Sequence, residues 1–159
     1  MRGADGKEWM RKKIDVPFAD DAEVERLAAE FAACKWPYER WTHRAHLALG
    51  AWLLQRMPFE EARATARTWI DRYNRTCGDP EGYHETITVL FLKGIAARMK
   101  DRRSPEGLAA LVEELKESLT MKWPLEHYSK ERLWSEEARR EWMAPDLKEL
   151  AEPGEESGK

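Results

Sequence analysis

The sequence predicts an all-α protein, an up-and-down helical bundle of about five to six helices. Apolar residues recur at helical spacing over most of the chain, as in "DDAEVERLAAEFAAC", where Val24, Leu27 and Phe31 share one face. No stretch alternates apolar and polar residues as a half-buried strand does, and there is no internal repeat. The links between successive helical stretches are short, which favours antiparallel neighbours.

The first two predicted helices are separated by a proline. The first spans residues 20–34 and starts with aspartates that can cap it. The segment "KWPYERW" then interrupts the pattern at Pro37. The second helix begins at Thr42, a favourable N-cap residue, and runs to about Arg56.

The third and fourth predicted helices flank the loop "GDPEG". Pro58 suits the first turn of the third helix, and Gly78 ends it. The fourth helix, "YHETITVLFLKGIAARMK" at residues 83–100, is the most apolar in the chain. We therefore expect it to be the most buried.

The fifth and last helical stretches follow serine residues. Ser104 and Pro105 predict the start of the fifth helix, which runs over residues 105–119. The segment "TMKWPLEHY" interrupts the pattern again. Ser129 then predicts the cap of a final helical stretch that extends to about Met143.

These elements form one predicted domain. Residues 15–150 would make a single helical bundle, which is long enough to bury a core. Residues 1–14 and 151–159 are polar, contain glycine and lack periodicity. They are predicted to be a flexible amino-terminal segment and a flexible carboxy-terminal tail.

The composition excludes several classes of partner. The net charge of −3 and the mixing of Lys and Arg with acidic residues argue against nucleic acid or an anionic membrane. The longest apolar run is too short to span a bilayer, and no signal segment is recognised, so we expect a cytoplasmic protein. Cys34 and Cys77 lie in unrelated sequence contexts and are interpreted as free thiols. The sequence allows a homo-oligomer.

The four histidines are the main functional signal. His43 and His46 occupy the first turn of the second helix, and His84 occupies the first turn of the fourth. In an up-and-down bundle these two helix starts lie at the same end. The fifth helix returns toward that end and is followed by His127. The sequence therefore predicts that all four imidazoles gather in one pocket.

The helical spacing also predicts that these side chains point inward. His43, His46, Gly50 and Leu53 fall on one stripe of the second helix. His84 begins a matching stripe on the fourth helix. Gly50 would let another helix approach closely.

Three inward imidazoles beside a carboxylate predict a divalent metal ion, Zn or Fe, with His43, His46, His84 and Glu85 as ligands. A metal-bound water with a pKa near 7 would be a ready nucleophile. The partial positive charge at two helix starts opposes a cation, and a carboxylate from Glu85 would offset it.

The favoured function is a small metal-dependent enzyme, hydrolase- or lyase-like, acting on a small polar or anionic molecule. Glu85 would serve as ligand or general base, and His127 and Tyr128 would close the pocket as further catalytic residues. Two alternatives stay open. One is a metal-free acid–base enzyme or ligand-binding module that uses the same His/Glu/Tyr cluster. The other is a non-catalytic helical interaction protein whose histidines form a buried structural network.

The motifs "WTHRAHLALGAWLL", "GYHETITVLFLKGIAARM", "EHYSKERLWSEEAR" and "APDLKEL" resemble a family of small uncharacterised bacterial proteins. The resemblance covers about residues 40–150 and implies no established activity. It implies that the following residues belong to the family pattern: Thr42, His43, His46, Tyr83, His84, Glu85, Thr86, Tyr128 and Ser129. A looser likeness, in architecture alone, is to metal-dependent four-helix hydrolases.

Overall fold

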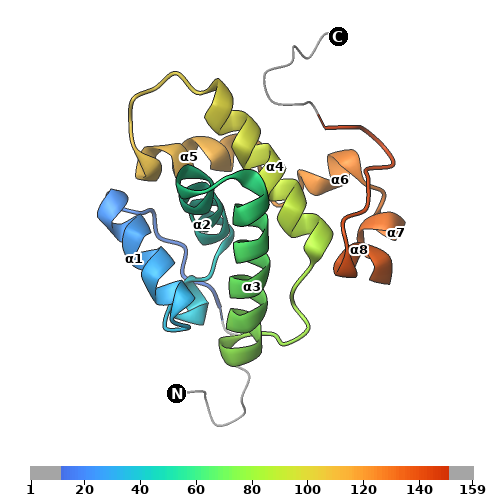
Figure 1. Ribbon diagram of the computed structural model, residues 1–159, viewed down its shortest axis with the longest axis horizontal. Coiled ribbons are helices and arrows are strands. Elements are labelled where there is room, and N and C mark those ends of the chain that lie inside the picture. The colour runs from blue at the N-terminus through green and yellow to red at the C-terminus, as the bar shows by residue number, and fades with distance from the viewer. Residues whose placement is uncertain (1–11, 151–159) are drawn as a thin grey trace.

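A computed structural model describes residues 12–150, and the chain in this range is entirely helical apart from its connections, which confirms the all-α prediction (Figure 1). The predicted tail 151–159 and residues 1–11 of the predicted segment 1–14 lie outside the described residues. Within residues 12–150 no helix has both the length and the apolar character of a membrane span. The helices are α1 Asp21–Ala32, α2 His43–Arg56, α3 Phe59–Cys77, α4 Glu85–Asp101, α5 Leu108–Ser118, α6 Pro124–His127, α7 Lys130–Leu133 and α8 Glu136–Arg140, with a 3-10 turn η2 at Tyr38–Arg40.

Side-chain caps start the first two helices. The carboxylate of Asp20 accepts a hydrogen bond of 3.0 Å from the main-chain N–H of Glu23. The hydroxyl oxygen of Thr42 accepts one of 3.2 Å from Ala45, which confirms Thr42 as the N-cap of α2. Each cap satisfies one of the main-chain donors that a helix start leaves unpaired.

Helix α2 lies at the centre of the bundle and packs against α1, α3, α4 and α5 (Figure 1). Its close contact with α4 occurs at Gly50, as the sequence predicted. A Cβ atom at Gly50 would lie 2.7 Å from Cδ1 of Ile95 and 3.4 Å from Cδ2 of Leu92. The missing side chain therefore lets α4 approach the α2 backbone.

The chain that leads into α1 is anchored by an arginine of α2. Arg44 is buried and binds two carboxylates, Asp15 in the leading segment and Glu113 on α5, each at 2.9 Å. The main-chain N–H of Ile14 donates to Glu39 O at 2.7 Å, and the ammonium group of Lys13 donates to Tyr38 O at 2.8 Å. Residues 13–15 thus make specific contacts with the bundle.

Helix α5 starts three residues later than the sequence predicted, at Leu108 instead of residue 105. Ser104 does not cap it, because its hydroxyl oxygen accepts from Glu106 N at 3.2 Å within the connection. The capping group comes from α1, where the carboxylate of Asp21 accepts a hydrogen bond of 2.9 Å from Ala109 N. A cap supplied by a distant helix leaves no signal in the local sequence.

The predicted final helix from Ser129 to Met143 is also broken in the structure. Ser129 caps only the single-turn α7, and Ser135 caps the short α8 that follows. The predicted interruption before it contains the one-turn α6. Beyond α8 the chain has no regular secondary structure and passes from the start of α4 to α6 (Figure 1).

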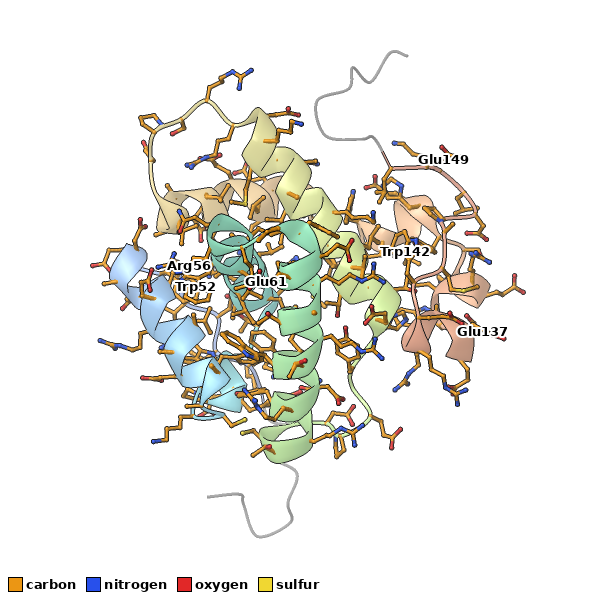
Figure 2. All side chains as sticks on the ribbon, in the orientation of Figure 1. Trp52, Arg56, Glu61, Glu137, Trp142 and Glu149 are labelled. Carbon is orange, nitrogen blue, oxygen red and sulfur yellow. The ribbon has the colours of Figure 1, made fainter. Side chains whose placement is uncertain are left out.

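We call residues 141–148 the carboxy-terminal strap, which is held by side chains of α4, α6 and α7. The hydroxyl of Thr86 donates to Glu141 O at 2.8 Å and accepts from Met143 N at 3.1 Å. Figure 2 shows Trp142 beside α4, where its ring centroid lies 5.3 Å from the ammonium group of Lys93. At residues 141–143, these contacts replace the helical hydrogen bonds that the sequence pattern predicted.

Candidate functional site

His84 forms the N-cap of α4, and both nitrogens of its ring are hydrogen bonded. Nδ1 accepts from Ile87 N at 3.1 Å, so the ring proton is on Nε2, which donates to Leu133 O at 2.7 Å. Burial lowers the pKa of His84, and the neutral ring needed for the cap is therefore favoured. In this arrangement the imidazole has no lone pair left for a metal ion.

His43 and His46 lie one turn apart at the start of α2, but they bind different groups. His43 donates from Nε2 to Leu119 O at 2.6 Å, beyond the end of α5. His46 donates from Nδ1 to Thr42 O at 2.7 Å and stacks on Trp41 with ring centroids 3.7 Å apart. Although part of the His46 side chain is exposed, its desolvation against the indole lowers the pKa to about 4, and burial also lowers the pKa of His43. Both rings are neutral at pH 7.

His127 and Tyr128 contact the carboxy-terminal strap. His127 donates from Nδ1 to Lys148 O at 2.7 Å, and the hydroxyl of Tyr128 donates to Met143 O at 2.5 Å. Burial raises the pKa of Tyr128 to about 12, so the phenol stays protonated and keeps this bond. These two predicted catalytic residues therefore bind main-chain carbonyl groups of the same segment.

The predicted ligands do not form a metal cluster. Among residues 12–150, no three His, Cys, Asp or Glu side chains lie close enough to hold a metal ion together. The structure brings His43 and His46 to one turn of α2, whereas the hydrogen bonds of His84 and Glu85 lead to other groups. The metal site that the sequence favours stays a prediction.

The buried carboxylate of Glu85 is the centre of a polar group, which we call the Glu85 cluster: Glu85, Tyr83, Arg63 and Arg67. The Tyr83 hydroxyl donates to Glu85 Oε1 at 2.6 Å. Two nitrogens of Arg63 lie 3.3 Å from Glu85 Oε2, and Nε of Arg67 lies 3.9 Å from Oε1. The Glu85 side chain is only 3% exposed, so these contacts supply the partners that a buried carboxylate requires.

Sequence reasoning did not identify Arg63 and Arg67 as site residues. They lie four residues apart on α3, and this spacing puts them on one helix face. That spacing was visible in the sequence, but the position of α3 against the start of α4 was not. The contact between α3 and α4 turns an ordinary pair of arginines into partners of Glu85.

The charges of the Glu85 cluster do not balance. Two guanidinium groups face one carboxylate, and the amino end of α4 adds partial positive charge. The Arg67 side chain is 61% exposed, compared with 30% for Arg63. Burial, followed by the hydrogen bond to Glu85, raises the pKa of Tyr83, so the phenol remains a neutral donor. The cluster therefore has a positive, solvent-facing side.

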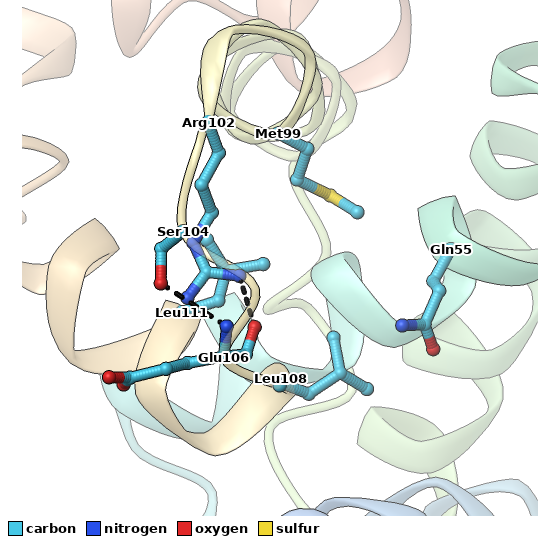
Figure 3. Close-up of a pocket in the computed structure, with 8 residues that line it drawn as sticks. Gln55, Met99, Arg102, Ser104, Glu106, Leu108 and Leu111 are labelled. Carbon is cyan, nitrogen blue, oxygen red and sulfur yellow. Dashed lines mark hydrogen bonds between the residues drawn. The ribbon is translucent and has the colours of Figure 1, made fainter.

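Two cavities lie away from the Glu85 cluster. One of about 160 Å³ is located between the ends of α2 and α4 and the start of α5 (Figure 3). A second, of about 240 Å³, shares Arg102 and Leu111 with it. The Arg102 guanidinium is already bound to Glu114 and to Glu106 O. None of the predicted site residues lines either cavity.

Comparisons of the chain with protein-family models, with curated proteins and with solved structures find no match.

Proposed function

We propose that the protein is a metal-independent binding module for a small anionic molecule, with the Glu85 cluster as its site. This is the ligand-binding alternative expected from the sequence, with Arg63 and Arg67 added to the site. The observation that carries the proposal is the unequal charge of the cluster, in which one buried carboxylate meets two arginines.

The exposed guanidinium of Arg67 is the group best placed to meet a ligand. Its Nε is 3.9 Å from Glu85, beyond normal hydrogen-bond length, whereas the Arg63 contacts are 3.3 Å. Arg67 can therefore turn its donors toward solvent without breaking a strong bond. Guanidinium groups bind carboxylates and phosphates through two parallel hydrogen bonds, which makes these anions the expected ligand class.

The state of Tyr83 supports binding over proton transfer. Its proton is committed to Glu85 at 2.6 Å, and its pKa is raised by burial. A phenol in this state is a poor general base at neutral pH. We propose that Tyr83 positions Glu85, which in turn orients the two arginines.

Titration calorimetry with inorganic phosphate and with oxalate tests this function, with a chelator present throughout. We expect saturable binding that the chelator leaves unchanged. Arg67→Gln should weaken it roughly tenfold or more, the loss expected for a charge-assisted hydrogen bond. Arg75→Gln is the matched control, because Arg75 is also exposed on α3 but pairs with Asp71 on its own helix. Equal effects of the two substitutions would contradict the proposal.

The metal-dependent enzyme remains a second proposal, supported by the start of α2. Nδ1 of His43 and Nε2 of His46 have no hydrogen bond within residues 12–150. Two neutral imidazoles one turn apart suit Zn or Fe, with further ligands from water or substrate. Elemental analysis of untagged protein tests this: near-stoichiometric metal that is lost in His46→Ala would support it, and metal-free protein would reject it.

A further inference from the structure

The two cysteines lie 43 residues apart in the sequence and are in contact in the fold. The thiol of Cys77 donates to the main-chain oxygen of Cys34 at 3.3 Å. Cys34 follows the end of α1, and Cys77 is the last residue of α3. No disulfide joins them in the structure. Their unrelated sequence contexts gave no hint of this contact.

The backbone of Cys34 is unusual for a residue with a side chain. Its φ angle is 59°, in the left-handed region, and among residues 12–150 it is the only non-glycine residue with positive φ. Helices commonly end with this conformation, but glycine or asparagine normally adopts it. The conformation holds the Cys34 carbonyl against the Cys77 sulfur.

We infer that Cys34 and Cys77 are a paired oxidation site, at which a disulfide forms between the ends of α1 and α3. The oxygen that Cys77 contacts belongs to the same residue that carries the other thiol, so both sulfurs lie at one junction. Cys77 is at a helix end, followed by Gly78, where small backbone movements can bring the sulfurs together. Both side chains are partly exposed, so a small oxidant can reach them.

The oxidant is a low-molecular-weight disulfide, and the reaction is two successive thiol–disulfide exchanges. One cysteine thiolate attacks the external disulfide, forms a mixed disulfide and releases one small thiol. The thiolate of the other cysteine then attacks the bound protein sulfur and releases the second small thiol. Two electrons pass from the cysteines to the oxidant, and the two cysteine protons end on the two small thiols.

The test is oxidation of the folded full-length chain with oxidised glutathione, followed by protease digestion without reductant and mass spectrometry. We expect one cross-linked species that contains both cysteines and is lighter by two hydrogen atoms. Reductant should reverse it. Closing this loop restricts the unfolded chain, so the thermal midpoint should rise by roughly 5 °C or more.

The same reaction in urea is the control, because unfolding separates the two cysteines. Closure should be at least about tenfold slower there than in the folded protein. Cys34→Ser and Cys77→Ser should each accept one glutathione and show no rise in the thermal midpoint. Stable glutathione adducts at both cysteines of the folded wild-type chain, or closure no faster than in urea, would overturn the inference.

Discussion

The hydroxyl of Tyr83 donates a 2.6 Å hydrogen bond to the carboxylate of Glu85, two residues farther along the chain. This bond holds a buried negative charge at the start of α4, where Arg63 of α3 also reaches it. The two residues come from one continuous motif, whereas the arginine is supplied by another helix. The start of α4 is therefore both a helix end and the centre of the proposed site.

Replacing Tyr83 with Phe should lower the free energy of unfolding by about 1–3 kcal/mol, because the buried carboxylate of Glu85 loses a donor. Urea denaturation followed by circular dichroism measures the effect. Tyr128→Phe is a matched comparison, since the Tyr128 hydroxyl donates to a main-chain carbonyl oxygen and not to a charged group. A Tyr83→Phe protein as stable as the wild type would show that Glu85 does not depend on this bond.

Stability should fall as the pH is lowered from about 6.5 toward 4, and His46 should contribute to the loss. Its pKa is about 4 in the folded protein against an ordinary value of 6.5, so the unfolded chain binds a proton that the folded protein does not. The contribution of His46 is thus present above pH 6.5 and is lost at lower pH. The lowered pKa values of His43 and His84 act in the same direction.

Denaturation of the wild type and of His46→Gln across the same pH series tests this linkage. The variant should show a shallower decline between pH 6.5 and 5, because one proton-binding difference has been removed. Carboxylates contribute equally to both proteins and cancel in the comparison. Parallel pH curves would mean that His46 does not titrate as described.

Conservative substitutions of His84 can remove its two hydrogen bonds one at a time. His84→Asn should keep an acceptor for Ile87 N and lose the bond to Leu133 O, whereas His84→Gln should do the reverse. Each should cost about 1–2 kcal/mol of unfolding free energy, and His84→Ala should cost more than either. Urea denaturation of the three variants measures these losses. An alanine variant no worse than the other two would argue against a structural role for both ring nitrogens.

Gly107 is expected to be intolerant of even a methyl group. The carboxylate of Asp21 occupies the space of a Cβ at this position, from which it caps α5 at Ala109 N. Gly107→Ala should displace the cap and destabilise the protein by about 0.5–2 kcal/mol. Thermal melts of the variant and the wild type measure the loss, and a Gly107→Ala protein as stable as the wild type would contradict this account.

The first four helices could be predicted from sequence because their signals are local. Thr42 caps α2 as expected, and Gly78 follows the last residue of α3. The start of α5 could not be predicted, because its cap comes from Asp21, 88 residues away from Ala109. The prediction of the last helical stretch was wrong for a similar reason. Thr86 of α4 binds the main chain at residues 141 and 143 and holds it extended.

The candidate site also contains residues that could be predicted from the sequence and residues that could not. Glu85 was recognisable as a functional candidate and Tyr83 as part of the same short motif, and the hydrogen bond between them is nearly local. Arg67 was not recognised, because no residue near it on α3 indicates that its side chain would contact Glu85. The histidines were recognised as unusual, but their partners Leu119 O and Leu133 O are main-chain oxygens. Every residue carries such an oxygen, so sequence cannot single them out.

The sequence by itself determined that the chain is helical, because helical spacing, capping residues and breaking residues act over a few positions. The tertiary structure alone decided which polar groups meet. It placed the Cys77 sulfur on the Cys34 carbonyl and Arg67 beside Glu85. The physical reason is that a buried polar group must find a hydrogen-bond partner among the groups that pack against it. Which groups pack against it depends on the whole chain.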